Sequence, residues 1–289
     1  MHVMWTLDLY FYLCHIEAAE KPYRRLLMIY DCRQKALKAR LNATEPPPAY
    51  SQEQIDALPD EVFAQCDSYM AVLQDSTYPI SFYLYYKGDA AFGGREVAGM
   101  AFPDAPGIEF YEVKTLEGER EKGDRFGALS VMTWARFHEA GRFEFDSVEL
   151  TFSDGERKAC PIGRFVVEVF ADEDSDALFT YSTPALSSNP TELGCIYEKQ
   201  AEDVVVHSLY MDIQAGYETE IAENDGVYEL ETTFTGGRPI VFRFILPRVE
   251  ASVGGKGLWI YPKVGCYCGG NGITEERMLD AWYAWQENA

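Results

Sequence analysis

Hydrophobic and polar residues alternate along much of this chain with the two-residue period of a β-strand. Between Val3 and Leu13 every odd position is apolar, with more polar or aromatic residues between them. Successive side chains of a strand point to opposite faces, so this pattern predicts a strand. The same period returns at Ile80, Phe82 and Leu84, ahead of a turn sequence at 87–89. Further strands are predicted near 109–115, 127–137, 146–152, 164–170, 203–213, 227–234 and 239–246.

Three segments have helical spacing instead. Pro22 is a good first helical residue, and an apolar stripe follows it, which predicts a helix over 22–42. Ser51 and Gln54 have the spacing of a capping box. Apolar residues then continue at helical intervals up to Leu73, so we expect helical structure over 52–75. The chain closes with a predicted helix over 274–287.

A strand, a glycine turn and a returning strand occur twice, at 148–167 and at 228–242. This cadence is common in immunoglobulin-like sandwich modules, although hairpins of any β fold share it. We therefore expect an α+β fold that is predominantly antiparallel β, with N-terminal helices and a C-terminal helix. The β region forms either one continuous body or two immunoglobulin-like or other β-sandwich units. The expected division is a strand plus helical N-terminal region (1–76), a β-rich region (77–198) and a β-rich region with the C-terminal helix (199–289).

Composition and charge narrow the classes of protein. The 289 residues are 47% hydrophobic and 25% charged, which are values of a folded chain. No run of 18 apolar residues is present, so we expect no membrane span. The net charge is −22, although residues 1–42 carry a net +3. A negative field repels phosphate backbones, so we expect no direct nucleic-acid binding and a protein as the partner.

The cysteines and the N-terminus suggest a compartment. Seven scattered cysteines form an odd set in a chain that is long enough to fold without disulfides. The apolar stretch from Val3 to Ile16 is interrupted by Asp8 and has no preceding Lys or Arg, so it is a poor signal peptide. We expect a cytoplasmic protein; the alternative is a secreted protein trimmed of its signal peptide.

One acidic run offers the donors that calcium prefers. Asp172, Asp174 and Asp176 place carboxylates at alternate positions, like the first half of a calcium-binding loop. An EF-hand needs Gly at the sixth position and Glu at the twelfth, where this chain has Ala177 and Thr183. The sequence therefore leaves a looser calcium site or a solvated acidic loop, and it names no other cofactor.

Aromatic residues offer another kind of contact. The chain has 19 Tyr, 17 Phe and 5 Trp, and exposed rings on a sheet can anchor a protein partner. Tyr12, Tyr83 and Tyr85 fall on the less apolar faces of their predicted strands and are the candidate contact residues. The alternative is that these rings cover the edge of the core or a helix.

Three classes of function remain, and we name no catalytic residue. A non-catalytic binding or protein-interaction protein of β-sandwich type predicts an exposed aromatic patch. An enzyme with a site assembled from distant residues predicts a pocket with convergent carboxylates or a Cys–His pair. An acidic decoy or inhibitor of a nucleic-acid-binding protein predicts rows of Asp and Glu on one face. The sequence favours the first class because it contains no catalytic signature.

Overall fold

The computed structural model describes residues 50–118, 120, 125–171, 179–183, 186–187, 189–200, 202–262, 266–269 and 275–286. Within these ranges most of the chain is antiparallel sheet, and two α-helices are present, so the predicted fold class is confirmed. The predicted strand at the start of the chain and the predicted helix 22–42 lie outside the described residues. Neither described helix is long and apolar enough to cross a membrane.

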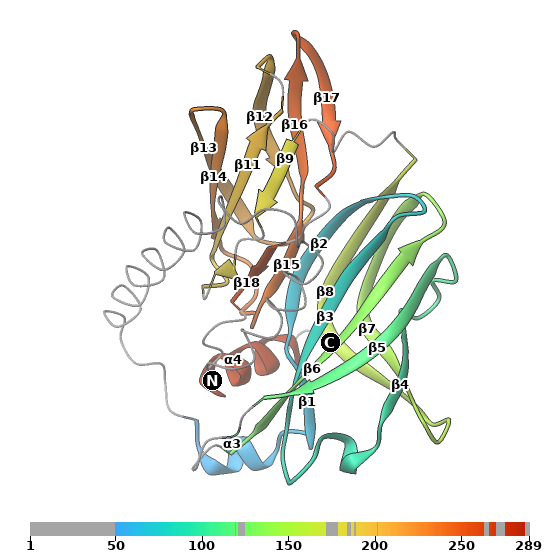
Figure 1. Cartoon of the computed structure of the whole chain (residues 1–289). Helices are drawn as coiled ribbons and strands as arrows, with labels where there is room; N and C mark the ends of the chain where they lie inside the picture. The colour runs from blue at the N-terminus through green and yellow to red at the C-terminus, as the bar shows by residue number, and fades with distance from the viewer. Residues whose placement is uncertain are drawn as a thin grey trace.

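A four-stranded antiparallel sheet forms one layer of the first β body (Figure 1). Its strands, in spatial order, are β1 (Glu61–Phe63), β3 (Thr77–Tyr86), β6 (Gly127–Phe137) and β5 (Ile108–Glu117). Ile80, Phe82 and Leu84 alternate along β3 and are fully buried, as their spacing predicts. The Phe82 ring lies 5.7 Å from that of Phe165 on the facing layer.

The facing layer is a seven-stranded sheet that continues beyond the first body. Its strands, in spatial order, are β10 (Leu186–Ser187), β18 (Cys266–Cys268), β15 (Arg243–Leu246), β2 (Cys66–Leu73), β8 (Arg157–Phe170), β7 (Gly141–Phe152) and β4 (Val97–Ala101). A 3₁₀ turn, η1 (Ala91–Gly94), precedes β4. Phenylalanines from both layers fill the space between them: the ring of Phe102, which follows β4, lies 6.2 Å from that of Phe82 on β3 and stacks on Phe145 of β7 at 4.0 Å.

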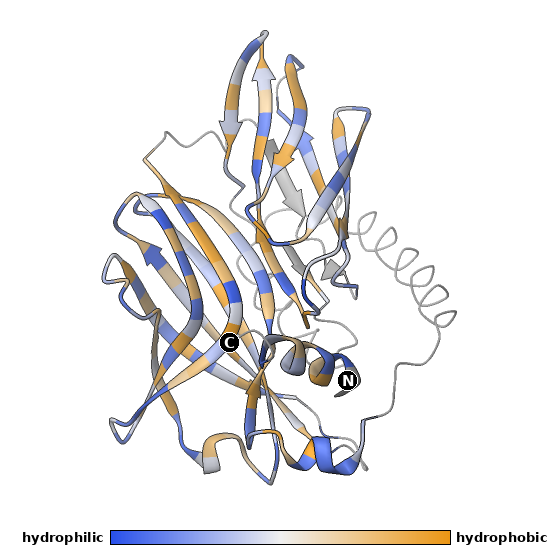
Figure 2. Ribbon diagram, turned by 180° about the vertical axis from the view of Figure 1, so that it is seen from behind, coloured by the Kyte–Doolittle hydropathy of each residue, from blue (hydrophilic) through white to orange (hydrophobic). Residues whose placement is uncertain are grey.

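Two smaller antiparallel sheets enclose a second core. One has the spatial order β13 (Gly216–Asn224), β14 (Val227–Thr235), β11 (Glu192–Lys199) and β9 (Phe179–Thr183). The other has the order β12 (Val204–Tyr210), β16 (Arg248–Val253) and β17 (Lys256–Ile260). Hydrophobic and hydrophilic bands alternate along several of these strands (Figure 2). Leu230, Val249 and Ile260 point inward and are fully buried.

Strand β2 belongs to both cores. Met70 and Val72 lie in the first core, whereas Tyr69, Ala71 and Leu73 lie in the second. All eight residues of β2 are buried, and β2 runs parallel to both neighbours, β8 and β15. Parallel strands covered on both faces have continuous apolar sequences with no two-residue alternation. The expectation of helical structure over 52–75 is therefore wrong beyond the first turns of that range. A strand whose two faces are both covered lacks the two-residue alternation by which a strand is recognised in a sequence.

The two described helices pack against each other beside the lower part of the first body (Figure 1). Helix α3 (Gln52–Asp56) begins with the predicted capping box between Ser51 and Gln54. Helix α4 (Glu275–Gln286) confirms the helix predicted over 274–287. Met278, Leu279 and Ile55 belong to one small separate cluster of buried residues.

The two predicted hairpins have different outcomes. The first is confirmed: β7 pairs with β8, and Gly155 occupies the turn with φ +86°. The second is wrong, because β14 is followed by β15, which pairs with β2 and β18. Val241 donates its backbone N–H to the carbonyl of Gln65, which carries this segment to the first body. The division into domains at 1–76, 77–198 and 199–289 stays a prediction. Each of the two cores contains residues from either side of both boundaries.

A buried ion pair joins β2 to β15, two strands that both cores share. Nη1 of Arg243 donates to Oδ2 of Asp67 at 2.6 Å, and each side chain is 3% exposed. Asp67 also accepts the backbone N–H groups of Gln214 and Ala215, from the loop after β12. Arg243 Nε donates to the carbonyl of Pro190. These charges are therefore well provided with hydrogen-bond partners despite their burial.

Arg164 on β8 extends this network to the surface. It donates to Asp212 Oδ1 and to Glu144 Oε1, each at 2.9 Å, and Arg142 donates to both acids as well. The hydrogen bond from Arg164, followed by that from Arg142, holds the pKa of Glu144 below its usual value although partial burial opposes this. Burial also acts to raise the pKa of Asp212, but the hydrogen bonds from the two arginines outweigh it and lower that pKa.

Candidate functional site

The outer face of the β12–β16–β17 sheet is the first candidate site. Tyr210 lies opposite Arg248 in the β12–β16 register, and Trp259 lies opposite Glu250 in the β16–β17 register. The alternate residues of each strand are buried in the second core. The strand period therefore places Tyr210, Arg248 and Trp259 together on the side that faces away from that core.

Arg248 is held among three aromatic rings. Its Cζ atom lies 4.6 Å from the ring centroids of Phe170, Tyr210 and Trp259. A guanidinium at this distance is attracted by the negative faces of the rings. Glu168 lies 3.9 Å from Nη2 of Arg248. Nε of Arg248 is buried and donates to no acceptor among the described residues, so the rings and Glu168 supply most of its electrostatic stabilisation.

The tyrosines beside this arginine stay neutral. Tyr69 donates its hydroxyl to Glu168 Oε2 at 2.5 Å. Burial, and then this hydrogen bond, raises the pKa of Tyr69 far above its usual value. Burial also raises the pKa of Tyr210, with Glu168 and Asp212 adding to the effect. Neither phenol is thus prepared to act as a base or nucleophile near neutral pH.

This sheet carries most of the large apolar side chains that the described surface exposes. Val205 is 45% exposed, Tyr210 37% and Trp259 36%; Tyr111, on β5, is the other large exposed one at 36%. We call Val205, Tyr210, Arg248 and Trp259 the aromatic face. The sequence pattern identifies β12 but not this surface, because nothing local shows which outward rings remain uncovered.

Polar side chains lie within and beside the aromatic face: Ser208 and Glu250 come between Val205 and Tyr210 in the strand registers, and Glu250 lies opposite Trp259. Ser208 donates to Glu250 Oε2 at 2.7 Å, and His207 Nε2 lies 2.9 Å from the hydroxyl of Ser252. These hydrogen bonds run between β12 and β16 and fix the polar side chains between the apolar ones. Protein contact surfaces commonly combine aromatic residues with hydrogen-bonding groups.

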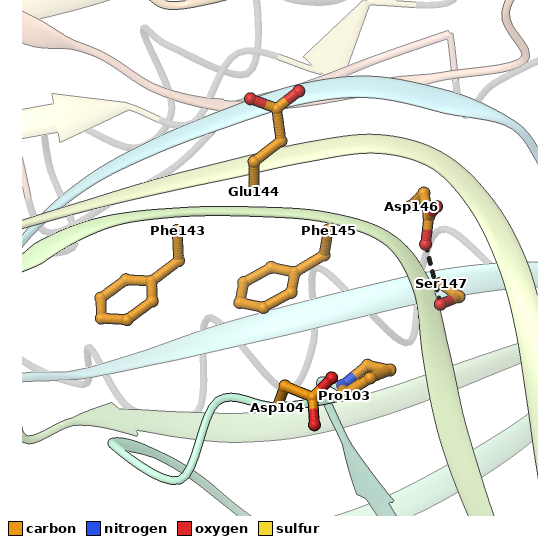
Figure 3. A pocket seen from close by; sticks show the side chains of 7 residues that line it. All are labelled: Pro103, Asp104, Phe143, Glu144, Phe145, Asp146 and Ser147. Atoms are coloured by element: carbon orange, nitrogen blue, oxygen red, sulfur yellow. Dashed lines mark hydrogen bonds between the residues drawn. The ribbon is translucent and has the colours of Figure 1, made fainter.

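A hollow of about 320 Å³ is the second candidate site. Pro103 and Asp104, in the turn after β4, form one side of it, and residues 143–147 of β7 form the other. Phe143 and Phe145 point the same way, toward that turn, with their ring planes 4° apart (Figure 3).

The charged groups of the hollow differ in their partners. Glu144 points away from the two rings (Figure 3) and binds Arg142 and Arg164. Asp146 accepts the hydroxyl of Ser147 at 2.9 Å. Asp104 makes no hydrogen bond or ion pair with any described residue. None of the residues lining the hollow is a cation.

The predicted contact tyrosines do not form an exposed patch. Tyr83 is 6% exposed, and its ring lies 5.1 Å from that of Phe242. The expectation that Tyr83 faces a partner is therefore at odds with the structure: the second face of its strand is also covered. Tyr85 is half-buried and packs against the cluster that contains Met278, which agrees with the alternative that these rings cover a helix or the edge of the core. Tyr12 lies outside the described residues.

The structure also bears on metal and thiol chemistry. Asp172, Asp174 and Asp176 lie outside the described residues, so the calcium hypothesis stays a prediction. In the part of the chain that is described, no three His, Cys, Asp or Glu side chains are grouped closely enough to hold a metal ion. Burial raises the pKa of the Cys66 and Cys160 thiols to about 12. These two thiols are therefore protonated near neutral pH and unsuited to nucleophilic catalysis.

Comparisons with known proteins identify no family for this chain. No protein-family model matches it, and no curated protein matches it. Solved structures with partial likeness include a chimeric titin Z1Z2 carrying an exogenous peptide from decorin. That structure is 13% identical, covers 72% of this chain and 95% of its own, and has a TM-score of 0.21.

Two other likenesses are of the same order. The tandem Ig repeats of Dlar are 8% identical and cover 72% of this chain and 97% of their own, with a TM-score of 0.19. The protein SGBP-B of Bacteroides ovatus, in complex with a mixed-linkage heptasaccharide, is 9% identical. It covers 77% of this chain and 45% of its own, with a TM-score of 0.23. At these TM-scores the likenesses carry no argument, and the β-sandwich description rests on the strand pairing and the two cores.

Proposed function

We propose that this chain is a non-catalytic interaction protein that binds another protein through the aromatic face. The observation that carries the proposal is the grouping of Tyr210, Arg248 and Trp259 on one side of a three-stranded sheet. Tyr, Arg and Trp are the residue types that contribute most to binding at protein interfaces.

The geometry of Arg248 favours tight binding once a partner covers it. Its guanidinium is already held at 4.6 Å from three rings. Less side-chain freedom is therefore lost when a partner docks, and preorganisation of this kind improves affinity. A partner that excludes water also strengthens the attraction between the cation and the rings.

Charge indicates the kind of partner. The chain carries a net charge of −22, so its field accelerates the approach of a positively charged protein. We expect association to slow as salt is added, because screening shortens the reach of that field. Contacts with Tyr210 and Trp259 then determine how long the complex lasts.

The test is capture of partners from the native host by the tagged protein, followed by mass spectrometry and by affinity measurement with the enriched protein. Tyr210→Ala and Trp259→Ala are each expected to weaken binding of that protein about 30-fold, the effect of losing about 2 kcal/mol. Tyr111→Ala is the matched control, because Tyr111 is equally exposed but lies on β5. Equal binding by all four proteins, or loss with Tyr111→Ala alone, would contradict the proposal.

A second candidate function rests on the outer face of β11, β13 and β14. The strand registers place six glutamates on this face: Glu192, Glu198, Glu218, Glu220, Glu229 and Glu231. Glu220 lies directly opposite Glu231, an arrangement that costs stability because like charges repel across strands. The acidic decoy hypothesis expects such a row of carboxylates.

Competition separates this second function from the first. A decoy that occupies a nucleic-acid-binding partner is displaced by excess duplex DNA or RNA, and Glu220→Lys with Glu231→Lys weakens its capture. Glu53→Lys with Glu96→Lys is the control, since both side chains are exposed elsewhere and the change in net charge is equal. Capture that resists nucleic acid, or that both pairs weaken equally, rules out the decoy function.

A further inference from the structure

We propose that the hollow between β7 and the Pro103–Asp104 turn binds an ammonium group on an alkyl stem, as a lysine side chain or a free amine presents it. This inference is independent of the aromatic face. It follows from the combination of apolar rings and uncompensated carboxylates in one cavity.

The rings select for a cation with an apolar stem. Phe143 and Phe145 lie side by side, with centroids 6.4 Å apart and planes nearly parallel (Figure 3). Phe102 stacks on Phe145 and fixes that ring in place. An alkyl stem buries apolar area chiefly against Phe143, which is only partly buried, and an ammonium group within about 6 Å of a ring centroid gains cation–π attraction.

The carboxylates select for positive charge. Glu144 is already neutralised by Arg142 and Arg164. Asp104 has no partner among the described residues, and Asp146 accepts only the hydroxyl of Ser147. Because no cation lines the hollow, its carboxylates repel an anionic ligand. A neutral ligand would cover the carboxylates of Asp104 and Asp146 without giving them a positively charged partner. An ammonium group satisfies both requirements.

The size of the hollow and the charge of the protein agree with this ligand. A volume of about 320 Å³ lies at the small end of the range for ligand pockets, roughly 300–1,000 Å³. The net charge of −22 raises the local concentration of cations around the whole molecule. Binding of a single amine is expected to be weak and to weaken further with salt.

The test is an NMR titration of the isotope-labelled full chain with butylammonium at low ionic strength, with butanol as the neutral control. We expect saturable shifts at Asp104 and at residues 143–147 with butylammonium but not with butanol. No shift there, or the same shift with butanol, overturns the proposal. Spectra of the variants show at once whether each one is folded.

Matched variants isolate the charge and the rings. Asp104→Asn is expected to weaken binding roughly two- to fivefold, the usual effect of one exposed ion pair. Asp225→Asn is its control: both residues lie in exposed turns with positive φ, +57° and +50°, which Asn also tolerates. Phe143→Leu is expected to weaken binding by a similar factor. Equal affinities for Asp104→Asn and Asp225→Asn refute the role of the hollow.

The two sources of the ligand are separated with a peptide. Acetyl-Gly-Lys-Gly-amide is titrated in parallel, with the norleucine peptide as its control. Shifts at the hollow with the lysine peptide indicate that the hollow binds a lysine side chain of a protein. Shifts with butylammonium alone indicate that it binds a free amine, and shifts with neither contradict the inference.

Discussion

Removing the arginine of the buried Asp67–Arg243 pair should destabilise the whole protein. In Arg243→Met, the carboxylate of Asp67 loses a hydrogen bond of 2.6 Å at a site where both side chains are 3% exposed. Breaking a buried pair costs about 3–5 kcal/mol, because one charge stays buried without its partner. Arg164, at 3.7 Å, and the N–H of Gln214 still face Asp67. We therefore expect the lower end, about 3 kcal/mol.

The double variant separates lost pairing from lost packing. Replacing Asp67 by Asn as well as Arg243 by Met removes both charges and leaves no buried ion. We expect the double variant to be at least about 1 kcal/mol more stable than the sum of the two single effects, as neighbouring charges couple. Arg157→Met is the control, since the Arg157–Glu149 pair is exposed and worth about 0–1 kcal/mol.

The assay is urea unfolding followed by tryptophan fluorescence and circular dichroism. Because the pair connects strands that both cores share, we expect the two signals to change in one transition with an unchanged slope. A loss below about 1 kcal/mol for Arg243→Met would refute the reasoning, since the desolvated Asp67 charge would then cost almost nothing. Additive effects in the double variant would refute the coupling.

Two further predictions concern the backbone and acid stability. A Cβ on Gly163, where φ is +93°, would lie 2.3 Å from the carbonyl oxygen of Cys66; Gly163→Ala should therefore cost about 3 kcal/mol or more in urea unfolding. Gly155→Ala, at φ +86° with open space around it, should cost only about 1–2 kcal/mol, and equal losses would exclude the clash. The pKa values of Glu144 and Asp212 are lowered, so the stability that they contribute is present above their ordinary pKa values and is lost as the pH falls below those values and through the lowered ones. Glu144→Gln should flatten that loss, as measured by unfolding midpoints at several pH values, and an unchanged pH profile would contradict this.

The elements that the sequence predicts correctly are those whose period is visible in one segment. Ile80, Phe82 and Leu84 show the alternation of β3, and Met278 with Leu279 shows the buried side of α4. Strand β2 has the sequence pattern of a helix because its neighbours cover both of its faces. The pairing of strands is also not determined by local sequence. The glycines after β14 resemble those of the β7–β8 turn, yet β15 pairs with β2 and β18 and not with β14.

The candidate sites are harder to predict than the strands. Tyr83 and Tyr210 occupy similar alternating patterns, but Phe242 covers Tyr83 while Tyr210 remains 37% exposed. Which ring stays uncovered depends on how the sheets stack, and the sequence of a single strand does not show this. The hollow likewise combines a turn after β4 with the middle of β7, and only the β4–β7 pairing brings them together.

The double coverage of β2 has a consequence for dissecting this protein. Each core contains side chains from the same strand, so a truncated chain that keeps only one half either loses a wall of that half or exposes an apolar face to water. A one-residue insertion in β2 would exchange the side chains offered to the two sides and disturb both at once. We therefore expect neither half to fold stably when it is produced without the other.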